Sequence, residues 1–101
     1  MRIMLACCAG ISTSLVVTKM QEAAKEQGKE YKIWAVDQKQ IEEELGNFDV
    51  LLLGPQIRHV LRKATKIVGD MAPIAIIDSR AYGRCDGEAV LEQAESLVGG
   101  K

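Results

Sequence analysis

The amino-terminal stretch constrains the fold more than any other part of the chain. Arg2 to Cys7 is a short apolar run, and it is followed by a segment of small and hydroxyl-bearing residues that includes Gly10. A run of this length that ends at a glycine-containing loop is typical of a buried β-strand. Alternation places Ile3, Leu5 and Cys7 on the same side of that strand, with Cys7 as its last residue.

The residues after this loop have the pattern of a helix. Apolar residues recur at helical spacing from Val16 to Ala24, and Gly28 is expected to end the helix. We expect the hydroxyl group of Ser12 or Thr13 to cap its first turn, because an N-cap oxygen accepts a hydrogen bond from an otherwise unpaired N–H group. The amino-terminal unit is therefore predicted to be a strand, a tight loop and a helix.

This unit has the properties of an anion site. The loop gathers unpaired backbone N–H groups at the positive end of a helix dipole, and Gly10 allows a tight turn. Hydrogen bonds to a charged group contribute roughly 1.5–3 kcal/mol each, whereas an exposed helix dipole contributes roughly 0.3–1 kcal/mol. The loop amides therefore matter most, and they favour both a bound phosphate and a cysteine thiolate. Cys7 is the candidate phosphoryl acceptor.

Length, charge and cysteine content limit the remaining possibilities. The 101 residues suit one domain, and a net charge of −1 argues against nucleic-acid binding. Three cysteines and one histidine form neither a disulfide framework nor a metal-binding pattern, so we expect no metal and no cofactor. No window approaches the roughly 18 apolar residues of a membrane span. We expect a cytoplasmic protein, because a reducing compartment suits its unpaired cysteines.

Strands and helices alternate along the rest of the chain. The pattern predicts further strands at 29–36, 48–53 and 72–77, helices at 38–45, 55–68 and 88–98, and a loop at 78–87. Such alternation predicts an α/β domain with a four-stranded parallel sheet and helices on both faces. A 2-1-3-4 strand order would put the switch point beside the first strand, where ligands bind outside the carboxyl ends of the strands. The Cys7 loop, the 54–56 turn and the 78–87 loop can converge there.

The predicted helix after Pro55 is strongly basic. Its exposed positions include arginines, lysines and His59, and no acidic residue occurs between positions 54 and 66. A solvated basic face explains this pattern, and so does a docking surface for an acidic partner, since complementary charge speeds and orients encounter. We assign His59 no catalytic role.

Three separated motifs resemble one protein family. They are Cys-x-Ala-Gly-Ile-Ser-Thr-Ser at 7–14, Leu-Leu-Gly-Pro-Gln-Ile at 52–57 and Ile-Asp-Ser-x-x-Tyr-Gly-x-x-Asp-Gly at 77–87. Together they resemble the enzyme IIB component of the lactose/cellobiose (chitobiose) group of the bacterial phosphoenolpyruvate-dependent sugar phosphotransferase system. The resemblance covers nearly the whole chain, so we expect residues 1–101 to form one domain of this type.

The resemblance implies an activity and partners. A IIB component of this group accepts phosphate from a phosphohistidine of the IIA component on one cysteine, and passes it to a sugar bound by the membrane IIC component. The motif puts this phosphocysteine at Cys7, and Cys8 stands where the family has serine. The resemblance favours a cellobiose-type sugar.

Two groups of residues complete the predicted site. The phosphate-binding loop consists of Cys8, Ala9, Gly10, Ile11, Ser12, Thr13 and Ser14, whose backbone N–H groups and hydroxyls can bind the equatorial oxygens of the phosphoryl group. Gln56, Asp78 and Tyr82 match the other family motifs and are predicted to lie at the rim of the site.

Two other functions share part of this pattern. A hydrolase of the low-molecular-weight tyrosine phosphatase type also uses a cysteine phosphate loop, but it has arginine six positions after the cysteine. Here Thr13 and Ser14 stand six positions after Cys7 and Cys8, respectively, and Asp78 is not followed by proline. A non-catalytic flavodoxin-like module that binds an anion or a partner is the second alternative. Intact mass after incubation with the upstream phosphohistidine proteins distinguishes it from a carrier.

Overall fold

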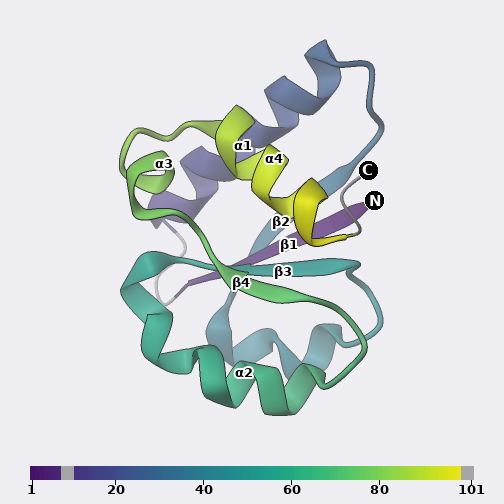
Figure 1. The fold of residues 1–101 in the computed structure, drawn as a ribbon, viewed down its shortest axis with the longest axis vertical. Coiled ribbons are helices and arrows are strands. Elements are labelled where there is room, and N and C mark those ends of the chain that lie inside the picture. The colour runs from purple at the N-terminus through teal and green to yellow at the C-terminus, as the bar shows by residue number, and fades with distance from the viewer. Residues whose placement is uncertain (8–10, 99–101) are drawn as a thin grey trace.

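The computed structural model describes residues 1–7 and 11–98, with the backbone alone at 11–13. Four parallel strands form one sheet in the order β2-β1-β3-β4, as the sequence predicted. Figure 1 shows the sheet between two helical layers, with α1, α3 and α4 on one face and α2 on the other. The strands are β1 (Arg2–Cys7), β2 (Lys32–Asp37), β3 (Val50–Leu53) and β4 (Ile74–Ile76).

Helices and 3₁₀ turns connect the strands along the chain. The α-helices are α1 (Ile11–Glu26), α2 (Leu61–Val68), α3 (Ser79–Gly83) and α4 (Gly87–Leu97), and the 3₁₀ turns are η1 (Gln38–Gln40), η2 (Glu42–Glu44) and η3 (Pro55–Val60). Helices lie between the strands in sequence because each connection between two parallel strands must bring the chain back to the same end of the sheet.

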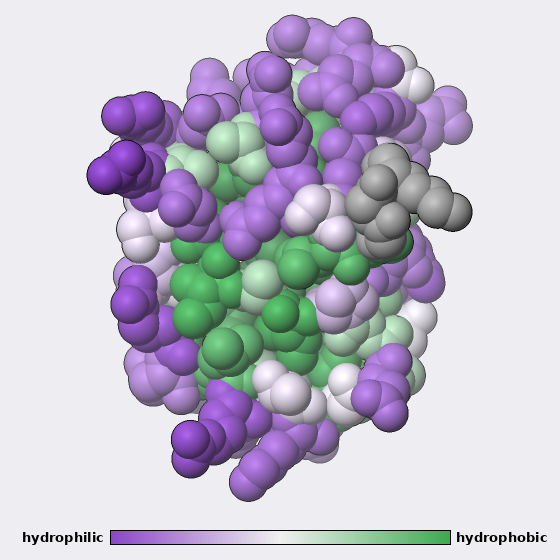
Figure 2. Space-filling view, in the orientation of Figure 1, coloured by the Kyte–Doolittle hydropathy of each residue, from purple (hydrophilic) through white to green (hydrophobic). Residues whose placement is uncertain are grey.

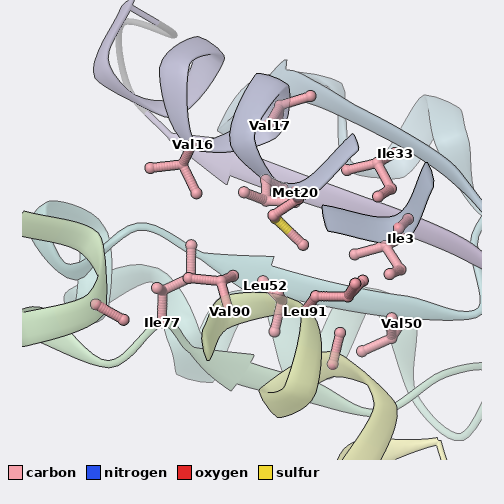
Figure 3. Close-up of a cluster of buried hydrophobic side chains, with 14 residues drawn as sticks. Ile3, Val16, Val17, Met20, Ile33, Val50, Leu52, Ile77, Val90 and Leu91 are labelled. Carbon is pink, nitrogen blue, oxygen red and sulfur yellow. The ribbon is translucent and has the colours of Figure 1, made fainter. Parts of the chain in front are cut away.

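The sheet separates two apolar clusters. On the α1 and α4 side, Ile3 and Leu5 of β1 pack with Val16 and Met20 of α1 and with Leu91 of α4 (Figure 3). On the other side, the alternate residues Met4 and Ala6 pack against η3 and α2. Each of these seven side chains is fully buried, so β1 is covered on both faces, as a central parallel strand requires.

Three predicted elements differ in kind from the structure. The predicted helix at 38–45 is two 3₁₀ turns, because Asp37 and Gln40 form a capping box that closes only one short turn. The predicted 78–87 loop contains the short helix α3. The helix predicted from position 55 begins as 3₁₀, with Ile57 outside helical geometry, before α2 starts at Leu61.

The strands are also shorter than predicted. The second, third and fourth strands begin at residues 32, 50 and 74 rather than 29, 48 and 72. Apolar residues continue the hydrophobic pattern before the ladder starts: Phe48 and Ala72, for example, are buried beside β3 and β4 without belonging to them. Burial and strand pairing are separate conditions, and the periodicity of a sequence reports the first.

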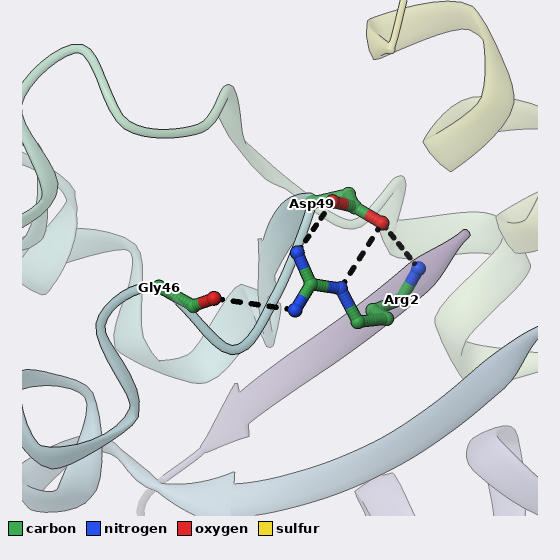
Figure 4. A network of polar contacts seen from close by, with 3 residues as sticks. All are labelled: Arg2, Gly46 and Asp49. Atoms are coloured by element: carbon green, nitrogen blue, oxygen red, sulfur yellow. Dashed lines mark hydrogen bonds and ion pairs between the residues drawn. The ribbon is translucent and has the colours of Figure 1, made fainter.

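One ion pair lies at the end of the sheet where β1 and β3 begin. The guanidinium of Arg2 pairs with Asp49 at 2.9 Å and also donates to the Gly46 carbonyl, and the backbone N–H of Arg2 donates to the same carboxylate at 2.7 Å (Figure 4). These hydrogen bonds from Arg2 hold the pKa of Asp49 below its usual value. The contact joins the start of β1 to the segment before β3, and Cys7 lies at the other end of β1.

The sheet ends on one side at the edge strand β4. Ile74, Ala75 and Ile76 are half-buried there, and apolar residues are visible across the middle of the molecule in Figure 2. The Gln93 side chain of α4 donates to the Ile76 carbonyl at 2.8 Å and accepts a hydrogen bond from the Asp78 N–H at 3.1 Å. The Gln93 amide therefore bonds backbone groups at the end of β4 with which another strand could otherwise pair.

Candidate active site

Cys7 lies where the sheet topology favours a ligand site. It is the last residue of β1, which has β2 on one side and β3 on the other, so it stands at the topological switch point of the sheet. Its position in the alternation puts it on the α1 side with Ile3 and Leu5. The residue is 3% exposed and is one of the buried apolar residues of the core. Cys7 is therefore a buried residue at the carboxyl end of a central strand.

The predicted phosphate loop is only partly described. Cys8, Ala9 and Gly10 lie outside the described residues, as do the side chains of Ile11, Ser12 and Thr13. The backbone shows that α1 begins at Ile11, with three residues between it and Cys7, the last residue of β1. Ser12 and Thr13 both lie within the first turn of α1, and the hydroxyl cap predicted from them concerns side chains outside the described part of the chain.

The start of α1 still supplies backbone donors. The first four N–H groups of an α-helix have no carbonyl partner within the helix, and the helix dipole adds positive potential at this end. In α1 the first three of these groups belong to residues 11–13. Ser14 is exposed, and its carbonyl accepts a hydrogen bond from the Thr18 hydroxyl at 3.1 Å. This end of the helix can therefore bind an anion.

Two of the predicted rim residues contact each other. The Gln56 side-chain amide donates to the Tyr82 hydroxyl at 2.8 Å, across 26 positions of sequence. Gln56 belongs to η3, which follows β3, and Tyr82 belongs to α3, which follows β4. The prediction that the loops after these strands converge is confirmed for this pair.

Gly54 connects this pair to the end of β1. Its N–H donates to the Ala6 carbonyl at 3.0 Å, one residue before Cys7. A Cβ atom at Gly54 would lie 2.6 Å from the Gln56 side-chain oxygen, so the glycine leaves room for Gln56 to fold back over the turn. A continuous set of contacts therefore runs from β1 through Gly54 and Gln56 to Tyr82.

Asp78 has a local structural role. Its carboxylate accepts a hydrogen bond from the Ala81 N–H at 3.1 Å and caps α3. Its own N–H donates to Gln93. These contacts hold α3, and with it Tyr82, at the end of the sheet where the strands finish. Asp78 is exposed, and it caps α3 at the end of the sheet where the strands finish.

Sequence reasoning missed one neighbour of Cys7. Asp37, the last residue of β2, pairs in register with Cys7 across the sheet. Its carboxylate accepts the Lys39 N–H at 2.9 Å as part of the capping box with Gln40. The sequence signal was present, since Asp37 directly follows an alternating apolar run, but only the register of β1 and β2 reveals that it adjoins Cys7.

The described residues offer no obvious metal or cofactor site. Among residues 1–7 and 11–98, no three histidine, cysteine or acidic side chains group closely enough to hold a metal ion. Two hollows of the described structure lie between η1, η2 and α2, and the larger of these two, of about 360 Å³, is lined by Lys39, Lys63 and nearby side chains. No helix in this part of the chain is long and apolar enough to cross a membrane.

Comparison with known proteins identifies the family. Residues 2–93 match the family described as the lactose/cellobiose-specific IIB subunit of the sugar phosphotransferase system. The chain belongs to this family, whose members are phosphotransferases.

Similar proteins cover nearly the whole chain. The oligo-beta-mannoside-specific EIIB component of Bacillus subtilis is 42% identical over 96% of this chain and 95% of its own length. The galactose-specific EIIB component of Lactococcus lactis subsp. cremoris is 43% identical over 95% of this chain and 94% of its own. The solution structure of the cellobiose-specific IIB component of Borrelia burgdorferi superposes with a TM-score of 0.81 and 35% identity, over 97% of this chain and 91% of that one. These relatives differ in their named sugar.

Proposed function

We propose that this protein is a phosphoryl carrier that accepts phosphate on Cys7 from a phosphohistidine of a IIA component. The phosphate then passes to a sugar bound by a membrane IIC component. Its membership of the IIB family gives the general activity. The observation that carries the residue assignment is the position of Cys7 at the end of β1, at the switch point and directly before the loop that leads to α1.

The chemistry requires little from the protein beyond placement. In the first step, Sγ attacks the phosphorus and the bond from phosphorus to the imidazole nitrogen breaks; the proton of the Cys7 thiol passes to that nitrogen, so the histidine leaves neutral. In the second step, a sugar hydroxyl attacks the phosphorus, the bond from phosphorus to Sγ breaks, and the hydroxyl proton returns to the departing sulfur. Both are in-line displacements, so they depend on orientation and on donors for the three equatorial oxygens. The N–H groups at the start of α1 supply such donors.

The low exposure of Cys7 suits a carrier. At 3% exposure, the side chain is largely inaccessible to bulk water in this structure, so a phosphocysteine in the same place is protected from hydrolysis. We propose that binding of the partner gives the donor histidine access to Sγ, which would couple transfer to the correct encounter.

Gln56 and Tyr82 are proposed as rim residues of this site. Their hydrogen bond at 2.8 Å joins the segments after β3 and β4, and Gly54 links them to the residue before Cys7. Asp78 holds α3 in place beside them. We expect these residues to position the rim against the partner and to take no part in bond making.

The sugar is proposed to be a cellobiose-type β-glucoside, which follows from the sequence resemblance and from the cellobiose-specific relative. The cytoplasm is the proposed location, because phosphate donors of this system are cytoplasmic proteins. Testing the function requires the purified protein, the IIA component encoded with it and the general phosphohistidine proteins. Intact mass should increase by one phosphate, and Cys7→Ser should prevent the increase while Cys8→Ser retains it. An unchanged mass for the wild-type chain would contradict the proposed function.

A further inference from the structure

One surface of the molecule carries a concentration of positive charge. Arg58 and His59 of η3 and Arg62, Lys63 and Lys66 of α2 form this basic surface, and all five side chains are exposed. The residues from Gly54 to Gly69 include no acidic side chain. In the part of the chain that the structure describes, ion pairs form elsewhere, at Arg2, Lys19 and Lys29. The basic surface therefore presents its charge to solvent.

Folding alone does not favour this arrangement. Four arginines and lysines lie in this segment of a chain whose net charge is −1, so the remainder carries a net charge of −5. Arg62 and Lys66 stand four residues apart in one helix, and like charges at that spacing destabilise a helix by roughly 0.2–0.5 kcal/mol. Attraction to an oppositely charged partner would offset the repulsion between these side chains.

The basic surface begins beside the proposed active site. The turn that starts η3 is hydrogen-bonded through Gly54 to Ala6, and Gln56 of η3 contacts Tyr82. Arg58 follows two residues later, and its Nε donates to the Pro55 carbonyl at 3.4 Å. The charge then continues along α2, on the lower side of the molecule in Figures 1 and 2, where hydrophilic residues line the surface. A protein that docks on this surface also reaches the rim.

We propose that the basic surface is a docking surface for an acidic face of the protein that donates the phosphoryl group. This inference rests on the proposed function, since it concerns the donor of the same reaction. A diffusing donor must find one small site in the correct orientation, and complementary charge raises the rate of such encounters and orients them. The donor's phosphoryl group is itself an anion that the same positive potential attracts.

An anionic membrane fits the surface less well. Clusters of four to eight lysines or arginines are typical of segments that bind anionic lipids, and the four here are at the low end of that range. Here Lys63 lines the same hollow as Glu42 and Glu43 of η2, so a flat anionic surface would meet carboxylates beside the lysine. A protein can instead place its acidic residues against the basic side chains and avoid the glutamates.

The test compares two charge reversals in the full-length protein. Arg62→Glu alters the basic surface, and Lys25→Glu is the matched control, because Lys25 is an exposed residue of α1 with the same charge change. The rate constant for phosphoryl transfer from phosphorylated IIA component is measured below saturation, at low and at high salt. Binding of each variant to vesicles that contain phosphatidylglycerol is measured alongside.

The proposal predicts that Arg62→Glu slows transfer about tenfold at low salt, and that this difference falls to about twofold or less near 0.5 M salt, where the Debye length is a few ångströms. Lys25→Glu should transfer at the wild-type rate. Equal effects of the two reversals, or no effect of either, would overturn the docking surface while wild-type phosphorylation upheld the proposed function. Loss of vesicle binding by Arg62→Glu with normal transfer would assign the surface to the membrane instead. Failure of the wild-type protein to accept phosphate would overturn both proposals.

Discussion

Replacing Gly87 with alanine tests the packing that holds α1 against α4. Gly87 is the first residue of α4, and it is buried against α1. A Cβ atom built there would lie 2.3 Å from the carbonyl carbon of Lys19, 2.4 Å from the N atom of Met20 and 2.5 Å from the Lys19 oxygen. All three are backbone atoms, so no side-chain rotation can relieve the clash.

The energetic cost follows from the required separation of the helices. Normal contact needs about 1 Å more space, and gaps of roughly 0.5–1 Å forfeit a quarter to a half of the dispersion energy of the contacts they open. Overpacking of a core costs about 1–3 kcal/mol, and alanine returns up to about 1 kcal/mol through its helix propensity. Because the clash involves three rigid atoms, we expect Gly87→Ala to lower the free energy of unfolding by about 2–3 kcal/mol.

Urea and thermal unfolding followed by circular dichroism measure this effect. For a chain of this size, the predicted loss lowers Tm by roughly 10–20 °C. Gly83→Ala is the matched control, because a Cβ atom at Gly83 would meet nothing within 4 Å. The control should be neutral or more stable by up to about 1 kcal/mol. Wild-type stability of Gly87→Ala would refute the close approach of the two helices.

Three further predictions concern charge, the rim and hydrolysis. Hydrogen bonds from Lys29 and Tyr31 lower the pKa of Glu95, so their stabilisation is complete above the usual value of 4.5 and is lost as pH falls through the lowered value. The stability advantage of wild type over Glu95→Gln, measured by urea unfolding, should therefore shrink as pH falls below 4.5, and a constant difference would count against this pairing. Tyr82→Phe removes the hydroxyl that accepts from Gln56 but keeps the ring, so transfer from the IIA component should slow several-fold while the free energy of unfolding changes by about 1 kcal/mol or less; unchanged transfer would remove Tyr82 from the rim. The purified protein should hydrolyse p-nitrophenyl phosphate only slowly, and rapid turnover in a colorimetric assay would favour the phosphatase alternative.

The sequence was sufficient to predict the sheet and its order. The apolar run of β1 has the same bounds as predicted, Arg2–Cys7, because pairing and burial end at the same residue there. The alternation of strands and helices predicted four parallel strands, and the 2-1-3-4 order expected for them is the order that the structure has. These features depend on patterns that repeat over many residues, so one exceptional position does not alter them.

Local geometry was harder to predict. The exposed glutamates of the 38–45 segment suited a helix, but the capping box at Asp37 and Gln40 closes a 3₁₀ turn and the chain continues as a second turn. The helix α3 has only five residues, which is too short to show a periodic pattern, and its cap at Asp78 looked like a loop residue. In both segments, single hydrogen bonds decide the conformation.

The candidate site was predictable in position but not in its contacts. The motifs pointed to Cys7, Gln56 and Tyr82, and the structure brings the last two into hydrogen-bond contact. The pairing of Asp37 with Cys7 depends on strand register, which no local pattern specifies. The burial of Cys7 likewise depends on what covers the end of β1, and the sequence suggested only that the residue adjoins a loop.

Mapping the modified residue after a single transfer reaction tests the central claim most directly. The wild-type protein would be phosphorylated by the IIA component, digested at neutral pH to preserve the labile thiophosphate ester, and analysed by tandem mass spectrometry. We predict one phosphate on the sulfur of Cys7. Phosphate on Cys8, or on any residue away from the end of β1, would contradict the account.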